Sequence, residues 1–348
     1  MASAIGYSTS TMPSASDRPT YTPDQLQQYY NYIGLPTSCH LTADSIQKLD
    51  VNKQLDFILR LIRHQLCKVP FENLDLHYSP VKGISLNHVF LFDKIVTRNA
   101  GRGGYCMQNN AFFGSVLRSL GFSVMSTGAR VSRQVDDGSS GKNQTEEVEY
   151  GGFGHQVNIL FFPNGKKYFC DVGFGASGPT FMVPLENGFT AINTGTVDQV
   201  ASSMRLHRGF TANNTHRSPG QELWIYSVKY GRADDESKPW IQSYCFSETE
   251  FFPSDFEIMS GWVSTSRTSM FVNKVICQKF LMAEDGESLI GDITLVDSSI
   301  KERRFGESRQ LTEIKSEDDR VTTLEKYVGV KLRRDESMGI SGFPSAIS

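Results

Sequence analysis

The sequence predicts an α+β fold in which a helical bundle is followed by a β domain and then by a smaller α/β unit. Up to Gly121, apolar residues recur at the three-and-four spacing of helices. From Phe122 onward, short segments rich in Val, Ile, Tyr and Phe are typical of strands. After Pro253, helical and strand patterns alternate. We expect a helical bundle over residues 21–121, a barrel-like β domain over 122–250, and an α/β lid with the C-terminal tail over 251–348.

The composition is that of a globular protein and excludes several classes of partner. The chain has 348 residues and a formal net charge of −3, so it has no bias toward nucleic acid or anionic membranes. No apolar run reaches the length of a membrane-spanning helix. Residues 1–20 lack the basic and apolar runs of a secretory signal, so we expect a disordered lead-in.

Cysteine usage indicates a reducing compartment. The six cysteines are scattered and form no C-x-x-C pair, which argues against a zinc ribbon or a thioredoxin-like site. Reduced thiols are the rule in the cytosol when a chain shows no export signal. We therefore predict a cytoplasmic protein without a bound metal, and the sequence implies no protein partner.

Helix signals dominate the first part of the chain. Thr22 as N-cap, Pro at the next position and Gln25 three residues on predict a helix start, and Gly34 marks its end. Longer apolar stripes predict helices over residues 45–67 and 85–96. A further helix follows a glycine-rich turn and ends at Gly121.

Strand signals dominate the middle of the chain. The segments predicted as strands are 122–131, 156–162, 167–172, 223–230 and 241–246. The turn sequence at 163–165 joins the second and third of these into a hairpin. The polar stretch 134–149 predicts an exposed loop, and 186–222 predicts a long connection because apolar runs are few.

The C-terminal part mixes both kinds of pattern. The predicted elements are a short helix over 254–262, strands over 270–281 and 289–296, and a final helix over 317–332.

The stretch with the clearest chemical content surrounds Cys106. Arg-Gly-Gly-Tyr precedes this cysteine, and an apolar helical stripe follows it up to Leu120. The spacing predicts a tight turn that delivers the thiol to the first turn of a buried helix. Free N–H groups at a helix N-terminus favour a thiolate, which is one way to make a nucleophile. A buried structural cysteine is the alternative interpretation.

A cysteine nucleophile needs a base and a group that orients that base. His155 follows a glycine-rich segment where a strand begins, and Asp171 ends the next strand. If the two strands form a hairpin, both side chains lie at its open end, where Asp171 can hold the imidazole tautomer. Alone, His155 would be interpreted as a satisfied histidine at a loop–strand junction and Asp171 as a turn cap. Together with Cys106 they predict a Cys-His-Asp core of the cysteine-protease or transglutaminase type.

The motifs in combination resemble the arylamine N-acetyltransferase family. The resemblance rests on three motifs: Arg102–Cys106 with Gln108 and Asn110, Gly154–Val157, and Asp171–Gly175. In addition, Val69–Leu74 is similar to the segment that precedes the cysteine motif in the family. It covers about residues 24–281. Details such as residues 91–96 look like the fungal branch.

The resemblance implies an activity and a mechanism. The family transfers an acyl group from acyl-CoA to an arylamine, an arylhydroxylamine or a hydrazine by a ping-pong route. Cys106 would accept the acyl group, His155 would act first as base and then as acid, and Asp171 would orient it. Backbone N–H groups near Cys106 would stabilise the oxyanion.

The same resemblance implies substrate contacts. Gly151 and Gly152 would line the path of the CoA pantetheine, and Phe153 with Gly154 would lie in the acceptor cleft. In the later motif, Trp262 and Thr268 match positions that touch CoA. The donor would be acetyl-CoA or, as in some fungal members, malonyl-CoA. The extra carboxylate of a malonyl group favours a cationic pocket, but the sequence singles out no residue for it.

The sequence also permits two alternative functions. The first is a Cys-His-Asp hydrolase or transglutaminase-like enzyme that does not use CoA, since the same three residue types serve acyl transfer to water or to lysine amines. The second is a CoA-binding or interaction protein without activity, in which Cys106 would be an inert buried thiol.

Overall fold

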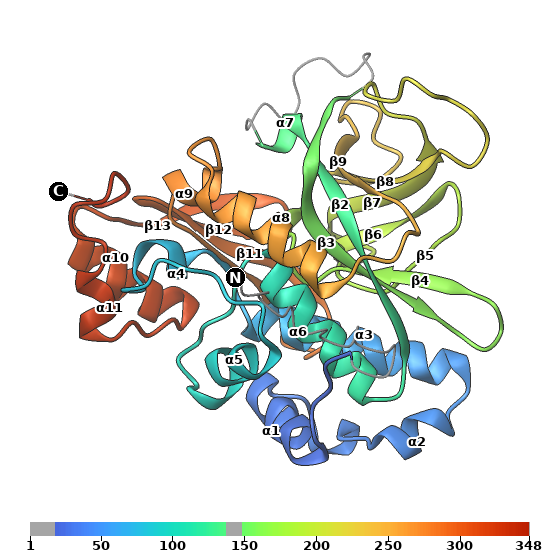
Figure 1. Cartoon of the computed structure of the whole chain (residues 1–348), viewed down its shortest axis with the longest axis horizontal. Helices are drawn as coiled ribbons and strands as arrows, with labels where there is room; N and C mark the ends of the chain where they lie inside the picture. Colours follow the sequence, from blue (N-terminus) through green and yellow to red (C-terminus); the bar gives the residue numbers. More distant parts are fainter. Residues whose placement is uncertain (1–17, 137–147, 348) are drawn as a thin grey trace, which may run out of the picture.

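Two antiparallel sheets and a set of helices make up the protein (Figure 1). The computed structural model describes residues 18–136 and 148–347. Most of the expected lead-in, and residues 137–147 of the expected loop, lie outside the described residues. Within the described part of the chain, no helix combines the length and the apolar character needed to cross a membrane.

The N-terminal helices follow the expected order with one difference. The helices are α1 (Pro23–Ile33), α2 (Ala43–Gln47), α3 (Val51–Lys68), α4 (Leu74–His77), α5 (His88–Phe92) and α6 (Cys106–Ser119), with a 3₁₀ turn at Thr37–Cys39 and a π-helical turn at Asp93–Thr97. The capping box of Thr22 and Gln25 at the start of α1 is confirmed. The single helix expected over 45–67 is wrong, because the Asp50 side chain accepts a hydrogen bond from the Lys53 N–H and starts a new helix there.

The larger sheet has eight strands in the order β5-β4-β3-β2-β9-β8-β7-β6. Its strands are β2 (Ser123–Ser132), β3 (Tyr150–Phe161), β4 (Lys167–Cys170), β5 (Val183–Pro184), β6 (Phe189–Gly195), β7 (Val200–Gly209), β8 (Leu223–Lys229) and β9 (Ile241–Phe246). The predicted hairpin of β3 and β4 is confirmed, with Asn158 opposite Cys170. A short helix, α7 (Arg133–Asp136), follows β2.

The long connection expected over 186–222 is wrong, because β6 and β7 lie within it. Three consecutive buried positions of β7 are occupied by small or polar side chains, those of Ala201, Ser202 and Ser203. Small side chains fill the interior of a barrel without producing an apolar run, so the strand pattern is hidden.

The eight-stranded sheet is nearly closed into a barrel. Asn193 on β6 accepts a hydrogen bond from the Thr180 N–H (3.1 Å) and donates one to the Gly178 carbonyl (2.9 Å). These bonds join β6, at one edge of the sheet, to the segment just before β5 at the other edge. Closing a sheet in this way removes exposed strand edges.

The smaller sheet has five strands in the order β1-β10-β11-β12-β13. Its strands are β1 (Phe71–Glu72), β10 (Ile276–Met282), β11 (Leu289–Val296), β12 (Ser299–Arg304) and β13 (Glu307–Glu313), accompanied by α8 (Pro253–Thr265), α9 (Met270–Asn273), α10 (Glu317–Thr323) and α11 (Arg334–Met338). The strand expected from 270 begins only at Ile276, because α9 precedes it. The helix expected to reach 332 ends at Gly329, which has a φ of 87°.

The helices cover both sheets. α6 packs against β2 and β3, α3 packs against β10, and α8 lies across β3 (Figure 1). Because β1 belongs to the N-terminal part of the chain and pairs with β10, the first and last parts share one sheet. The division of the chain at residues 121 and 250 stays a prediction.

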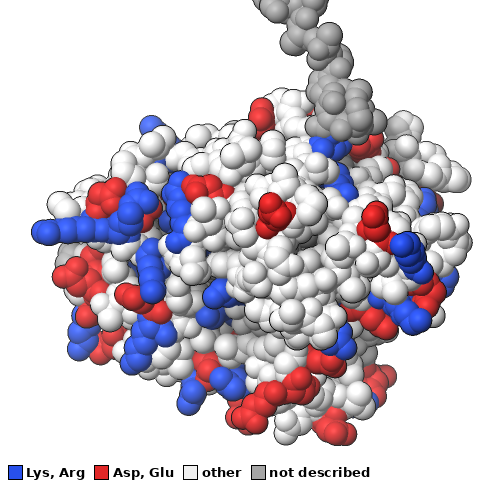
Figure 2. Space-filling model, turned by 90° about the horizontal axis from the view of Figure 1, so that it is seen from below, with Lys and Arg blue, Asp and Glu red and all other residues white. Residues whose placement is uncertain are grey.

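Surface charge is mixed in sign. Figure 2 shows a face on which Lys and Arg lie beside Asp and Glu around a broad area that carries few charges. This face offers no extended patch of a single sign for a polyanion to bind.

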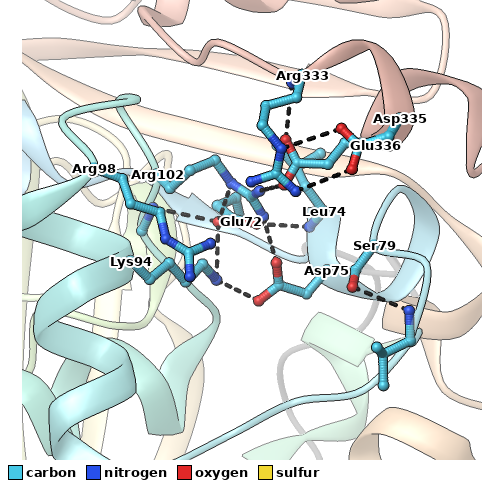
Figure 3. Close-up of polar contacts among 12 residues, drawn as sticks. Glu72, Leu74, Asp75, Ser79, Lys94, Arg98, Arg102, Arg333, Asp335 and Glu336 are labelled. Carbon is cyan, nitrogen blue, oxygen red and sulfur yellow. Dashed lines mark hydrogen bonds and ion pairs between the residues drawn. The ribbon is translucent and has the colours of Figure 1, made fainter.

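A buried cluster of charges joins β1, α4 and the segment before α6 (Figure 3). Arg102 donates to Glu72 (3.1 Å) and to Asp75 (2.6 Å), and Lys94 lies 2.5 Å from Asp75 and 3.3 Å from Glu72. Glu72 also accepts the N–H groups of Leu74 (2.6 Å) and Gly103 (3.3 Å). The cluster therefore fixes the backbone just upstream of Cys106.

The ionisation of this cluster is set by its internal pairing. Burial alone would raise the pKa of Asp75, but Lys94 and Arg102 outweigh it and lower that pKa to about 2. The pKa of Glu72 is lowered for the same reason, with Arg102 contributing more than Lys94. Both carboxylates are thus charged at neutral pH. Their contribution to the free energy of unfolding is fully present above the carboxyl pKa of the unfolded chain, about 4. It is lost as the pH falls through the lowered pKa of each group, which for Asp75 is about 2.

Replacing Glu72 by Gln tests this cluster. The amide would place N–H groups against Arg102 and Lys94 and leave those buried cations without a full counter-charge. We expect the free energy of unfolding, measured with urea at pH 7, to fall by roughly 3–5 kcal/mol. Asp335→Asn is the matched control, because that carboxylate pairs with Arg333 at the exposed edge of the same cluster, and no measurable change is expected there. An unchanged stability in E72Q would contradict the role given to the cluster.

Candidate active site

Cys106 is the first residue of α6, and the residue is 4% exposed. The turn before it needs its glycines, because a Cβ at Gly103 would overlap the Pro70 carbonyl and one at Gly104 would lie 2.5 Å from Gln108 Oε1. Tyr105 is the N-cap and provides no side-chain cap. The N–H groups of the first turn and the positive end of the helix dipole therefore face the thiol region, which favours negative charge there.

A β-bulge turns the backbone of β3 toward Cys106. Ala129 on β2 lies opposite His155, but its neighbour Arg130 lies opposite Phe153, so Gly154 is the extra residue. The Cys106 thiol donates to the Gly154 carbonyl at 3.5 Å. Bulges commonly re-aim groups next to active sites. Here the bulge allows one strand to present both His155 and the Gly154 carbonyl beside the thiol.

His155 and Asp171 form a buried pair. The ring Nε2 lies 2.7 Å from Asp171 Oδ2, and both side chains are almost completely buried. The His155 ring packs against both Phe174 and Tyr244, each with its ring centroid 5.0 Å away. Burial alone would lower the pKa of His155, but the charge and hydrogen bond of Asp171, with a smaller contribution from a hydrogen bond to Cys106, raise it to about 10. The imidazolium form is therefore stabilised at neutral pH.

Two asparagines support this pair, and the sequence identified only one of them, without a role. Asn110, in the second turn of α6, donates to Asp171 Oδ1 (2.8 Å) and to the Gln156 carbonyl (2.7 Å). Asn158 on β3 donates to the Asn110 carbonyl (2.8 Å). The signal that could have revealed the role of Asn110 is its spacing, because a residue four positions after Cys106 lies on the same face of the helix.

Of the other predicted site residues, some lie close to Cys106 and others lie at the surface away from it. Phe153 packs in an apolar cluster with Cys106 and side chains of α8. A Cβ at Gly152 would meet open space. Trp262 is 68% exposed and Thr268 is exposed, so both side chains lie outside that cluster. The structure therefore brings together the cysteine, the histidine, the aspartate and Phe153, but not Trp262 and Thr268.

Comparisons with known proteins agree with this architecture. A family model described as N-acetyltransferase matches residues 54–337. The N-malonyltransferase FDB2 of Fusarium pseudograminearum is 37% identical over 328 residues, which is 92% of this chain and 93% of that protein. Arylamine N-acetyltransferase 1 of Homo sapiens is 30% identical over 302 residues, 83% of this chain and 91% of that protein.

Solved structures share the fold. The arylamine N-acetyltransferase of Mycobacterium marinum in complex with CoA superimposes with a TM-score of 0.64 at 24% identity, covering 91% of this chain and 99% of that one. The fold and the family model together define an N-acetyltransferase. The similar relatives identify the particular family within this class. The chain belongs to the arylamine N-acetyltransferase family.

Replacing Gly173 by Ala tests how closely the Asp171 loop packs on α6. The added Cβ would lie 2.7 Å from the Cys106 carbonyl oxygen and 2.8 Å from Asn110 Nδ2. We expect the free energy of unfolding in urea to fall by about 1–3 kcal/mol, the usual cost of overpacking. Gly152→Ala, where the Cβ meets open space, should change it by less than about 0.5 kcal/mol. Equal stabilities of the two variants would show that the loop does not pack on α6 as described.

Replacing Asp171 by Asn tests the electrostatics of the pair. The wild-type His155 stays protonated until the pH approaches about 10, so an imidazolium is available to hold a Cys106 thiolate at neutral pH. Without the carboxylate, the pKa of His155 falls, because the charge and the hydrogen bond of Asp171 are what raise it, and the positive charge beside Cys106 is weakened. At about pH 6.5, alkylation of Cys106 by iodoacetamide should then be slower than in the wild type, since a nearby cation favours the reactive thiolate.

The background for this measurement comes from Cys106→Ser, which reports alkylation of the other cysteines. A wild-type rate that rises with pH like that of an ordinary thiol, with no loss in D171N, would contradict the assignment.

Proposed function

We propose that this protein is an acyl-CoA-dependent arylamine N-acyltransferase that moves an acetyl or malonyl group to an arylamine, an arylhydroxylamine or a hydrazine through an acyl-cysteine. The observation that carries the proposal is the placement of the Cys106 thiol, at the N-terminus of α6, beside a His155 whose pKa is raised by Asp171. Membership of the arylamine N-acetyltransferase family supports the reaction class.

The first half-reaction acylates Cys106. Its thiolate attacks the thioester carbonyl carbon, and the developing oxyanion is stabilised by N–H groups at the start of α6. The bond between the acyl carbon and the CoA sulfur breaks. The departing CoA thiolate takes the proton held on the His155 imidazolium, so CoA leaves as the free thiol and His155 becomes neutral.

The second half-reaction transfers the acyl group. The amine nitrogen attacks the acyl carbon while neutral His155 accepts a proton from that nitrogen. The bond between the acyl carbon and Sγ breaks, which regenerates the thiolate–imidazolium pair and releases the amide. Asp171 keeps the imidazole oriented in both halves, and Asn110 holds Asp171.

The substrate contacts are also part of the proposal. Gly151 and Gly152 would line the pantetheine path, and the open space beside Gly152 supports this. Phe153 and Gly154 would form the acceptor cleft. Trp262 and Thr268 would meet the outer part of CoA, because exposed side chains are available to a ligand that extends to the surface. The free state of all six cysteines supports the expected location in the cytoplasm.

Turnover by a Cys106 variant tests the proposed function. We expect the wild type to release free CoA from acetyl-CoA or malonyl-CoA in an amine-dependent way, and to gain the mass of one acyl group when the amine is omitted. Cys106→Ala should lose turnover by at least about 10⁴-fold, as expected when the nucleophile is removed from a catalytic unit. Retained amine-dependent turnover in C106A would refute the mechanism. Amide hydrolysis without CoA would instead support the hydrolase alternative.

A further inference from the structure

Arg130 lies beside the aromatic wall of the candidate active site. It is on β2, directly opposite Phe153 and next to the bulge at Gly154. The carbon at the centre of its guanidinium group is 3.8 Å from the centroid of the Phe153 ring. Nη1 donates to the Gly151 carbonyl at 3.2 Å. The guanidinium group is therefore stacked on Phe153 and tied to the backbone of the predicted pantetheine path.

The charge of Arg130 has no carboxylate partner among residues 18–136 and 148–347. A guanidinium group has five N–H donors in a planar fork, and the contact to Gly151 uses one of them. Stacking on an aromatic face leaves the edge of the guanidinium group free to bind a planar oxyanion in a bidentate way.

Two other arginines of the N-terminal half, the buried Arg102 and the half-buried Arg118, are less suited to the same task. Arg102 is engaged by Glu72 and Asp75. Arg118 lies in the last turn of α6, at the end of the helix opposite to Cys106. Arg130 is thus the arginine of this group that combines a free binding edge with proximity to the thiol.

We propose that Arg130 binds the carboxylate of a malonyl group on the acyl donor and so sets the preference of the enzyme for an anionic acyl group. This inference rests on the proposed function. Gly154, whose carbonyl lies 3.5 Å from the Cys106 thiol, is the immediate neighbour of Phe153, on which Arg130 is stacked. A malonyl carboxylate is separated from the thioester carbonyl by a single methylene group, so it lies within a few bonds of Sγ. The CoA diphosphate carries the same oxyanion chemistry, but the whole pantetheine arm separates it from the thioester.

The test compares acylation rates of Arg130→Met and Arg130→Lys with three donors. The donors are malonyl-CoA, acetyl-CoA and the acetyl thioester of N-acetylcysteamine, which has no diphosphate. In R130M we expect kcat/KM for malonyl-CoA to fall roughly 10- to 100-fold, the loss expected for a hydrogen bond to a charged group. Both acetyl donors should change less than about threefold. R130K keeps the charge but not the bidentate fork and should fall in between.

Arg205→Met is the matched control. Arg205 is a half-buried arginine of the same sheet, stacked over Trp240 at 4.8 Å, and it lies on β7. Its removal should leave all three donors unaffected. Urea unfolding of R130M and R205M checks that both variants fold equally well.

Each other outcome overturns the inference. Equal losses with all three donors in R130M would indicate a general effect on acylation. A loss with both CoA esters, but not with the N-acetylcysteamine ester, would assign Arg130 to the diphosphate. No loss with any donor would show that Arg130 does not contact the donor.

A binding measurement separates failure of this inference from failure of the proposed function. In a Cys106→Ser background, which cannot turn over, malonyl-CoA should raise the melting temperature more than acetyl-CoA at equal concentration. Adding R130M should remove the difference. If the wild type transfers no acyl group, the proposed function fails, while a difference that persists in the double variant refutes the role of Arg130.

Discussion

The buried contact between Arg102 and the carboxylates of Glu72 and Asp75 is the constraint on which the site depends. It ties the turn before α6 to β1, and β1 pairs with β10 of the smaller sheet. Burying ions is costly unless each is paired and hydrogen-bonded. In this cluster Lys94 and the backbone N–H groups of Leu74 and Gly103 complete that pairing. The cluster therefore specifies one position for the turn, and with it one position for the thiol.

The same constraint explains why two separate motifs occur in the chain. The segment 69–74 supplies Glu72, and the segment 102–106 supplies Arg102 and two glycines that tolerate close backbone contact. The two motifs therefore supply the two partners of one buried ion pair, Glu72 and Arg102. A second set of hydrogen bonds then joins α6 to the barrel through Asn110, which holds both Asp171 and β3. Preorganisation of this kind lets dipoles and charges act on a transition state without rearrangement.

The sequence predicted the elements that are specified by a short local pattern. It did not predict features that depend on how strands pair in the folded protein. The capping box of α1 and the hairpin turn at 163–165 are short-range patterns, and both are confirmed. The strand pattern of β7 was missed because most of its buried positions carry small or polar side chains. The strand pattern of β12 was missed because charged side chains follow one another along it. The meeting of His155 and Asp171 followed from the hairpin. The contact of Arg130 with Phe153 could not be predicted, because it depends on a bulge that shifts the register by one residue.

That register shift bears on how donor choice and catalysis are related. His155 and Phe153 flank the bulged Gly154 on one strand, so the base and the aromatic platform for Arg130 are positioned by the same backbone irregularity. A one-residue change of register reverses the face to which every following side chain points. Without the bulge, Phe153 and His155 would be two residues apart in a regular strand and would point to the same face, so the contacts of His155 with Asp171 and of Phe153 with Arg130 could not both form. Substitution of Arg130 alone leaves the backbone in place, so acyl preference can vary at this position while the relation of Cys106, His155 and Asp171 is kept.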